Sequence, residues 1–220
     1  MPSRRTSTTR WRFHLSGRAC LDLANTVSWR RGGKPIERLN DYGDLLEWAR
    51  QSRALTAAEV LSLERAARRR PAAAAQVLRR ARELRETLYR IFSGIASGAQ
   101  PARDDLARLD AELHEAFGAL HLTWTRSRAA LAWSDTAEHL ARPLWTAARS
   151  AADVLASSTL GRMKTCPGSG CGWVFLDTSK SGTRRWCDMR VCGSRDKAQR
   201  YYARLTGSRR GRARRPRRPA

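Results

Sequence analysis

Two short segments, 166-CPGSGC-171 and 187-CDMRVC-192, decide the fold of the last third of this 220-residue chain. Four of its five cysteines stand in these two Cys-x4-Cys pairs, with fifteen residues between them. Tetrahedral zinc sites commonly use two close cysteine pairs separated by a longer connector. Pro167, Gly168 and Gly170 favour a sharp turn that points two thiolates at one ion. The spacing predicts that one Zn²⁺ is bound by Cys166, Cys171, Cys187 and Cys192.

Three other interpretations of the paired cysteines remain open, namely a redox switch, an iron–sulfur cluster and unrelated buried thiols. We favour zinc because a segment too small to build its own core needs a bound metal or another cross-link to stabilise it. A reducing cytosol argues against structural disulfides. The fifth cysteine, Cys20, stands alone and is interpreted as an ordinary core thiol.

The residues around the cysteine pairs predict a short strand and a basic helix. In 173-WVFLD-177, Trp173 and Phe175 alternate with two aliphatic residues, so we expect them to pack beside the metal, with base stacking as the alternative. The helix begins near Ser194, a good N-cap, and is rich in Arg and Lys. Such a helix is suited to reading a nucleic-acid groove or backbone; the alternative is a solvated charged face.

The first 160 residues predict a mainly α-helical domain with one short β-hairpin. Apolar residues recur at three- and four-residue steps, Asn40 is a suitable N-cap, and Thr56 and Glu59 form a capping box. Pro143 is expected to kink or restart the last helix of this region. The expected helices are 40–52, 56–70, 71–98, 101–120 and 135–158, and the hairpin is 121–134.

The charge of the chain favours a polyanionic partner. Its formal net charge is +23, and the 60 residues from Gly161 onward hold 17 basic and three acidic residues. Neutralising phosphates with such charges releases condensed counterions, so nucleic acid is the expected partner. The sequence contains no run of eighteen apolar residues and no secretory h-region, so we expect a cytoplasmic, nucleoid-associated protein without a membrane span.

Residues 163–205 resemble the CGNR zinc-finger family in cysteine spacing and in "CGWVFLD" and "RRWC". Upstream, "GRACLDLANTV" and "LNDYGDLLEWA" resemble the ABATE domain of stress-induced transcription regulators. The resemblance implies a bacterial protein with a helical N-terminal domain, four cysteine ligands and DNA binding. Ser194 stands where the family usually has Asn. Both residues cap helices well, so the helix start should be retained, whereas a base contact by Asn is in doubt.

We therefore expect four segments and a defined set of candidate sites. The segments are a flexible N-terminus (1–10), an ABATE-like helical domain (11–160), a treble-clef-like or knuckle-type four-cysteine zinc finger (161–206) and a disordered basic tail (207–220). Asp22, Asn25 and Thr26 either line a small-molecule pocket or cap local backbone. The expected nucleic-acid contacts are Arg184, Arg185, Arg190, Arg195, Lys197, Arg200 and Arg204, with Arg195 ranked above Arg204 for base contact.

The function expected from these features is that of a zinc-dependent DNA-binding protein, a transcription regulator and not an enzyme. No Ser/His/Asp order, phosphate-binding Gly-rich loop or His cluster is present in the sequence. Two alternatives are an RNA- or ribosome-associated zinc protein and a ligand-binding or interaction module with purely structural zinc. A small-molecule effector and homodimer formation are left open.

Overall fold

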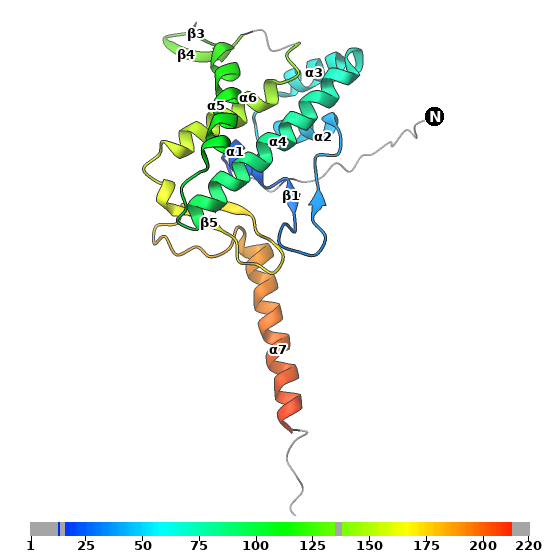
Figure 1. The fold of residues 1–220 in the computed structure, drawn as a ribbon, viewed down its shortest axis with the longest axis vertical. Coiled ribbons are helices and arrows are strands. Elements are labelled where there is room, and N and C mark those ends of the chain that lie inside the picture. Colours follow the sequence, from blue (N-terminus) through cyan, green and yellow to red (C-terminus); the bar gives the residue numbers. More distant parts are fainter. Residues whose placement is uncertain (1–12, 14–15, 135–137, 213–220) are drawn as a thin grey trace, which may run out of the picture.

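The structure is a computed structural model, and it describes residues 13, 16–134 and 138–212, with side chains up to residue 205. The expected flexible segment 1–10 lies outside the described residues. A helical body holds the N-terminal part of the chain, the cysteine-rich segment lies against one end of it, and helix α7 extends away from that end (Figure 1). None of the described helices is long and apolar enough to cross a membrane.

Helix α4 (Pro71–Ala96) is the central element of the body. Pro71 fits its first turn, and one face buries Leu84, Leu88, Ile91 and Phe92. The other helices of the body pack around it and around each other; they are α1 (Ala19–Ala24), α2 (Tyr42–Gln51), α3 (Ala57–Arg69), α5 (Arg103–Gly118) and α6 (Arg142–Leu155). The mainly helical fold expected from the sequence is confirmed.

Three helices begin later in the chain than the expected ranges: α2, α6, and α5, which begins at Arg103 and not at Pro101. The N-cap of α2 is Asp41, whose carboxylate accepts a hydrogen bond from Asp44 N at 2.8 Å. Asn40 instead donates from its side chain to Asp44 Oδ2 at 3.1 Å. Helix α6 begins at Arg142, which confirms the expected restart at Pro143, because proline is tolerated in a first turn but not in a helix interior. The capping box of Thr56 and Glu59 at the start of α3 is confirmed.

The described part of the chain also contains three antiparallel two-stranded hairpins. The hairpin expected at 121–134 is confirmed as β3 (Leu120–Thr125) and β4 (Arg128–Trp133). The other two pair β1 (Val27–Ser28) with β2 (Ile36–Glu37), and β5 (Met163–Thr165) with β6 (Val174–Leu176). A single-turn 3₁₀-helix, η1 (Leu160–Arg162), leads from the helical body into β5.

The cysteine-rich segment does not have a core of its own apart from the metal site. Met163 on β5 and Val174 and Leu176 on β6 belong to the same buried cluster as Leu88 of α4. The second cluster consists of the four paired cysteines and Phe175, with Trp173 and Trp186 packed against it. Strand β6 therefore turns one side to the body and the other to the cysteines.

Helix α7 (Ser194–Arg212) follows a π-helical turn, η2 (Met189–Gly193), and is longer than expected. It continues to Arg212, although the sequence led us to expect a disordered tail from residue 207. Arginine has a good helix propensity, and the first proline of the tail is Pro216, so nothing in 207–212 forces the helix to end. Residues 213–220 lie outside the described residues.

Candidate metal centre and the helix that follows it

The four paired cysteines converge on one point. Cys166 and Cys171 lie in the loop between β5 and β6, Cys187 precedes η2, and Cys192 lies within it. All four are buried, and their Sγ atoms lie within 4.8 Å of one another. Sγ of Cys187 is 3.7 Å from Sγ of Cys171 and 3.7 Å from Sγ of Cys192. A tetrahedron with Zn–S bonds of about 2.3 Å has edges of about 3.8 Å. The donor set therefore fits one zinc ion.

The thiols hold their protons unequally. Hydrogen bonds from Cys171 and Cys187 lower the pKa of Cys166, whereas hydrogen bonding to Cys166 and Cys171 raises the pKa of Cys187. A divalent cation lowers the pKa of every thiol that it binds and displaces these protons. Cys20 is different, because burial raises its pKa to about 12 and it lies in the helical core. The prediction of an ordinary core thiol at Cys20 is confirmed.

A loop of the helical body holds the first cysteine turn. The backbone N–H groups of Arg30 and Arg31 donate to the carbonyls of Cys171 and Gly170 at 3.2 and 3.1 Å. Gly170 has φ +74°, and a Cβ there would lie 2.5 Å from Cε3 of Trp29. Only glycine allows the cysteine turn to approach Trp29 this closely. The loop between β1 and β2 thus forms one wall of the metal centre.

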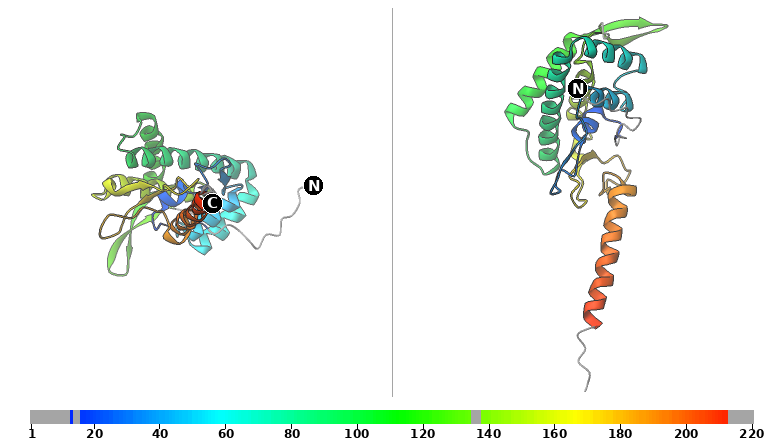
Figure 2. Two further views of the ribbon diagram at one scale, coloured as in Figure 1. Left: turned by 90° about the horizontal axis from the view of Figure 1, so that it is seen from below. Right: turned by 90° about the vertical axis from the view of Figure 1, so that its right-hand side faces the viewer.

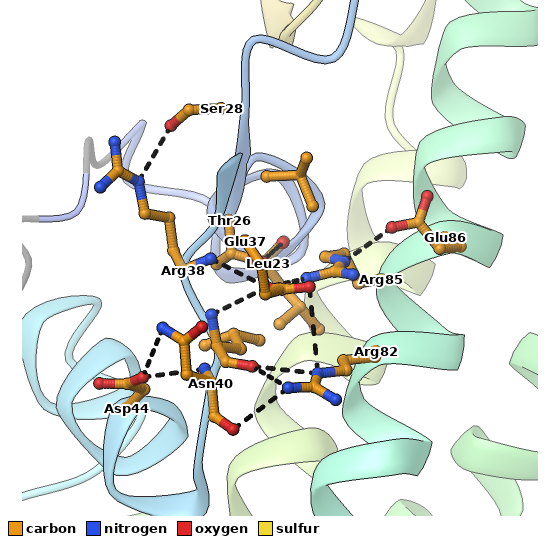
Figure 3. A network of polar contacts seen from close by, with 12 residues as sticks. Leu23, Thr26, Ser28, Glu37, Arg38, Asn40, Asp44, Arg82, Arg85 and Glu86 are labelled. Atoms are coloured by element: carbon orange, nitrogen blue, oxygen red, sulfur yellow. Dashed lines mark hydrogen bonds and ion pairs between the residues drawn. The ribbon is translucent and has the colours of Figure 1, made fainter. Parts of the chain in front are cut away.

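That loop is tied to α4 by a chain of ion pairs. Arg30 Nη1 lies 2.8 Å from Glu86 Oε2, and its guanidinium lies 3.9 Å above the Tyr89 ring. Arg85 connects Glu86 to Glu37 of β2, with contacts of 2.8 and 2.6 Å (Figure 3). Burial raises the pKa of Glu86, but the hydrogen bond and charge of Arg30 and the charge of Arg85 outweigh it, so the net pKa is lowered. Both carboxylates therefore stay charged and hold the β1–β2 hairpin on α4.

The two residues just before strand β6 are held by polar contacts with the body. Trp173 Nε1 donates to Val27 O at 2.8 Å, and the Tyr89 hydroxyl donates to Gly172 O at 3.0 Å. The alternation in 173-WVFLD-177 is confirmed, because Trp173 and Phe175 pack beside the cysteines while Val174 and Leu176 enter the main core. The finger and the body therefore share an extensive interface.

A buried carboxylate organises the loop between β6 and the second cysteine pair. Asp177 Oδ2 accepts from Lys164 Nζ at 2.6 Å and from Arg184 N at 2.9 Å, and Ser179 donates to Oδ1. Hydrogen bonds from Lys164 and Ser179 lower the pKa of Asp177. No role for Asp177 was expected from the sequence. An acidic residue at a strand end with a serine two positions later was the available signal.

Arg184 is part of the same scaffold, and its expected phosphate contact stays a prediction. Its Nε donates to Trp186 O at 2.9 Å, its Nη2 donates to Cys187 O, and its guanidinium lies 4.8 Å above the Phe175 ring. Nothing in the sequence indicates that Arg184 binds the carbonyls next to the metal site. A basic side chain in a basic segment therefore could not be distinguished from one that contacts nucleic acid.

The expected contacts on α7 divide between two faces. Arg195 is half-buried, and its guanidinium lies 4.4 Å above the Trp29 ring of the body. Lys197, Arg200 and Arg204 are spaced by three and four residues, share one face and are exposed. Arg195 lies nearly opposite them on the helix and packs against the body, and its expected rank above Arg204 for base contact stays a prediction.

The remaining expected contacts near the metal centre are exposed. Arg185 and Arg190 are exposed at the level of the second cysteine pair, with the Arg185 guanidinium 5.3 Å above the Trp186 ring. Arg200 also forms an ion pair with Asp196 at 2.8 Å. Arg185, Arg190 and the face of Lys197, Arg200 and Arg204 are therefore exposed basic side chains of the same C-terminal segment.

Asp22, Asn25 and Thr26 hydrogen-bond to the protein itself. Asp22 Oδ1 accepts from Ser16 N at 2.5 Å, and Thr26 Oγ1 donates to Leu23 O at 2.8 Å, as expected for caps of local backbone. Asn25 reaches farther, because its side chain binds both backbone polar groups of Val174. It also lines a cavity of about 440 Å³ together with Arg184 and Arg190.

A helical domain with a four-cysteine cluster and a projecting helix defines a zinc-finger protein. The sequence model of the ABATE family, described as "Putative stress-induced transcription regulator", matches residues 17–158, and that of the CGNR zinc finger matches residues 162–205. The chain belongs to the ABATE family and carries a C-terminal CGNR zinc finger. No curated protein matches its sequence.

Proposed function

We propose that this protein is a DNA-binding transcription regulator in which zinc and the helical body together hold α7 in position to bind DNA. The observation that carries the proposal is the charge and exposure of α7. Its 19 residues include seven basic residues and one acidic residue. Every side chain from Lys197 to Leu205 is exposed. The helix is about 28 Å long, which is enough to cross a DNA groove.

A helix that is polar on all sides gains little from packing against its own protein. Among the described residues, η2 is the one element with which α7 makes extensive contact, and the helix projects from the body (Figure 1; Figure 2, right). Its like charges repel one another in water, and a row of phosphates would neutralise them. Polyanion binding therefore accounts for a feature that costs stability in the isolated protein.

A bound zinc ion would fix the position of α7 and would not take part in a reaction. Four cysteines complete a tetrahedral zinc site and leave no open coordination position for a substrate. Cys192 is two residues before Ser194, so a bound ion would fix the first turn of α7. Trp29 fixes the same turn from the side of the body through Arg195. Rigid placement of the first turn aims the exposed face of Lys197, Arg200 and Arg204.

RNA is the second candidate ligand, and one observation favours it. Tyr201 and Tyr202 are 60% and 65% exposed on α7, with ring centroids 5.8 Å apart. Exposed aromatic side chains stack on unpaired bases, which structured RNA offers more often than duplex DNA. The charge of α7 alone does not distinguish the two ligands.

Competition binding tests the proposal. The zinc-loaded chain is titrated into a fluorescein-labelled mixed-sequence DNA duplex at about 0.15 M salt, and bound duplex is then displaced by unlabelled duplex or by structured RNA. We expect binding that weakens steeply with salt and that duplex DNA competes at least as well as RNA. Preferential displacement by RNA would favour the second candidate, and weak, salt-insensitive binding of both would contradict the proposal.

A further inference from the structure

The β3–β4 hairpin carries an apolar face that the protein only half covers. In its register Leu120 is opposite Trp133, Leu122 opposite Leu131, and Trp124 opposite Ala129. Directly opposed residues project to the same side of a hairpin, and every second residue does so along each strand. One side of the hairpin is therefore formed by Leu120, Leu122, Trp124, Ala129, Leu131 and Trp133, without a charged or polar side chain.

The half of this face nearest the body is covered by α6. The Trp133 ring lies 5.6 Å from the Trp145 ring, and the Arg142 guanidinium lies 4.9 Å above Trp133. The outer half extends beyond the helices (Figure 2). There Leu122, Trp124 and Leu131 are 73%, 72% and 51% exposed. A two-stranded hairpin is marginally stable in water without a layer on its apolar face, so this half lacks the covering that the inner half has.

We infer that the outer half of the β3–β4 hairpin is a self-association surface, on which the same hairpin of a second copy of this chain packs face to face. An isologous contact places each apolar residue against the equivalent face of the partner, so it buries no charge from either copy. The chain has a net charge of +23, and the basic helix α7 leaves the opposite end of the molecule (Figure 1). A contact between hairpins therefore keeps the two α7 helices far apart, whereas an acidic partner would be attracted to α7 and not to this uncharged face.

The size of the face sets the strength of the contact. A whole aromatic side chain offers roughly 150–250 Å², so the exposed part of Trp124 and the two leucines together offer on the order of 300 Å² per copy. That area is typical of a functional surface patch. Two copies would bury on the order of 600 Å² in total from these residues, which places the contact among weak, reversible interfaces. A dimer with a micromolar dissociation constant is expected, and it does not depend on DNA binding.

Sedimentation equilibrium of the nuclease-treated, zinc-loaded full chain tests this inference between about 1 and 200 μM, the range that brackets a micromolar dissociation constant. We expect the average mass to rise with concentration from 24.8 kDa toward twice that value. Association should be equal or stronger at about 1 M salt, because salt screens the repulsion between the two cationic copies and strengthens apolar contacts. Leu122→Gln and Trp124→Gln should each raise the dissociation constant by about tenfold or more.

Leu61→Gln is the matched control. Leu61 is 57% exposed on α3, so its replacement removes a similar exposed side chain elsewhere, and association should be unchanged. Circular dichroism and thermal unfolding confirm that each variant is folded. A mass of 24.8 kDa at every concentration would overturn the inference. Wild-type association by the folded Trp124→Gln variant would also overturn it, because the contact would then lie on another surface.

Discussion

Asn25 of the helical body pairs with Val174 of the zinc finger as a neighbouring strand would. Its Nδ2 donates to Val174 O at 2.8 Å, and Val174 N donates to its Oδ1 at 3.0 Å. Both residues are buried. One side chain of the body thus satisfies both backbone groups of a residue in β6, and the stability of the finger is coupled to that of the body.

The first prediction concerns this pair. Asn25→Ala leaves two buried backbone groups without partners, and we expect it to lower the free energy of unfolding by about 1–3 kcal/mol and to weaken zinc binding. Asn25→Asp should be nearly as damaging, because a carboxylate cannot donate to Val174 O. Thr26→Val is the control, since it removes a single local bond. Urea unfolding measures the free energy of unfolding of all three variants. Equal stability of Asn25→Ala and wild type would contradict the coupling between the finger and the body.

The second prediction concerns the close approach of the first cysteine turn to Trp29. Gly170 and Gly182 both have positive φ, of +74° and +66°, but a Cβ at position 182 would meet nothing within 4 Å. Gly182→Ala should therefore cost about 1–2 kcal/mol from the backbone alone. Gly170→Ala should cost about 1–3 kcal/mol more, because the methyl group overlaps the indole.

Competition for zinc with a chromophoric chelator shows whether the substitution also weakens zinc binding. We expect Gly170→Ala to lose zinc more readily than Gly182→Ala. Equal chelator resistance and equal thermal stability of the two variants would mean that the β1–β2 loop does not support the cysteine turn.

The third prediction separates Arg195 from the exposed face of α7. Arg195→Ala removes its contact with Trp29 and should cost about 0.5–2 kcal/mol of stability, with a DNA affinity within about threefold of wild type. A double-mutant cycle with Trp29→Leu should show that the two stability losses are not additive. A loss of affinity for a preferred DNA site, without a similar loss for random DNA, would instead give Arg195 a base contact.

The fourth prediction concerns metal removal. We expect elemental analysis to find one zinc per chain, lost in Cys192→Ser and retained in Cys20→Ala. After chelation under reducing conditions, hydrogen exchange should accelerate most in residues 177–205, which depend on the second cysteine pair. Strands β5 and β6 should keep more protection because Met163, Val174 and Leu176 pack in the main core.

Metal removal should also affect the body. Its shared core with β5 and β6 means that chelation lowers the melting temperature of the body itself. An unchanged melting temperature of the body would instead indicate that the body and the finger fold independently.

The sequence predicted the parts of this structure that depend on local spacing. The four cysteine ligands, the capping box of Thr56 and the alternation around Phe175 follow from residues close together in the chain. The contact of Trp29 with Gly170 and the hydrogen bonds of Asn25 join residues more than 140 positions apart, and no local sequence pattern predicts them. A hydrogen bond with so large a separation follows only from the packed tertiary structure.

Charge type was also insufficient to assign the arginines. Arg184, Arg195 and Arg204 look alike in a basic segment, yet the first holds backbone carbonyls, the second lies on an indole and the third is exposed. Their roles depend on the direction of each side chain relative to the metal centre. That direction follows from the tertiary structure and not from composition.

The most direct test of the account is the salt dependence of DNA binding by two variants of equal charge. The first replaces Lys197, Arg200 and Arg204 with alanine, and the second replaces Arg65, Arg68 and Arg79, which are exposed on α3 and α4. We predict that the first variant lowers the slope of log affinity against log salt by about 2–3 and that the second leaves it nearly unchanged. Equal slopes for the two variants would show that net charge alone drives binding, and would contradict a role of α7 as the DNA-binding element.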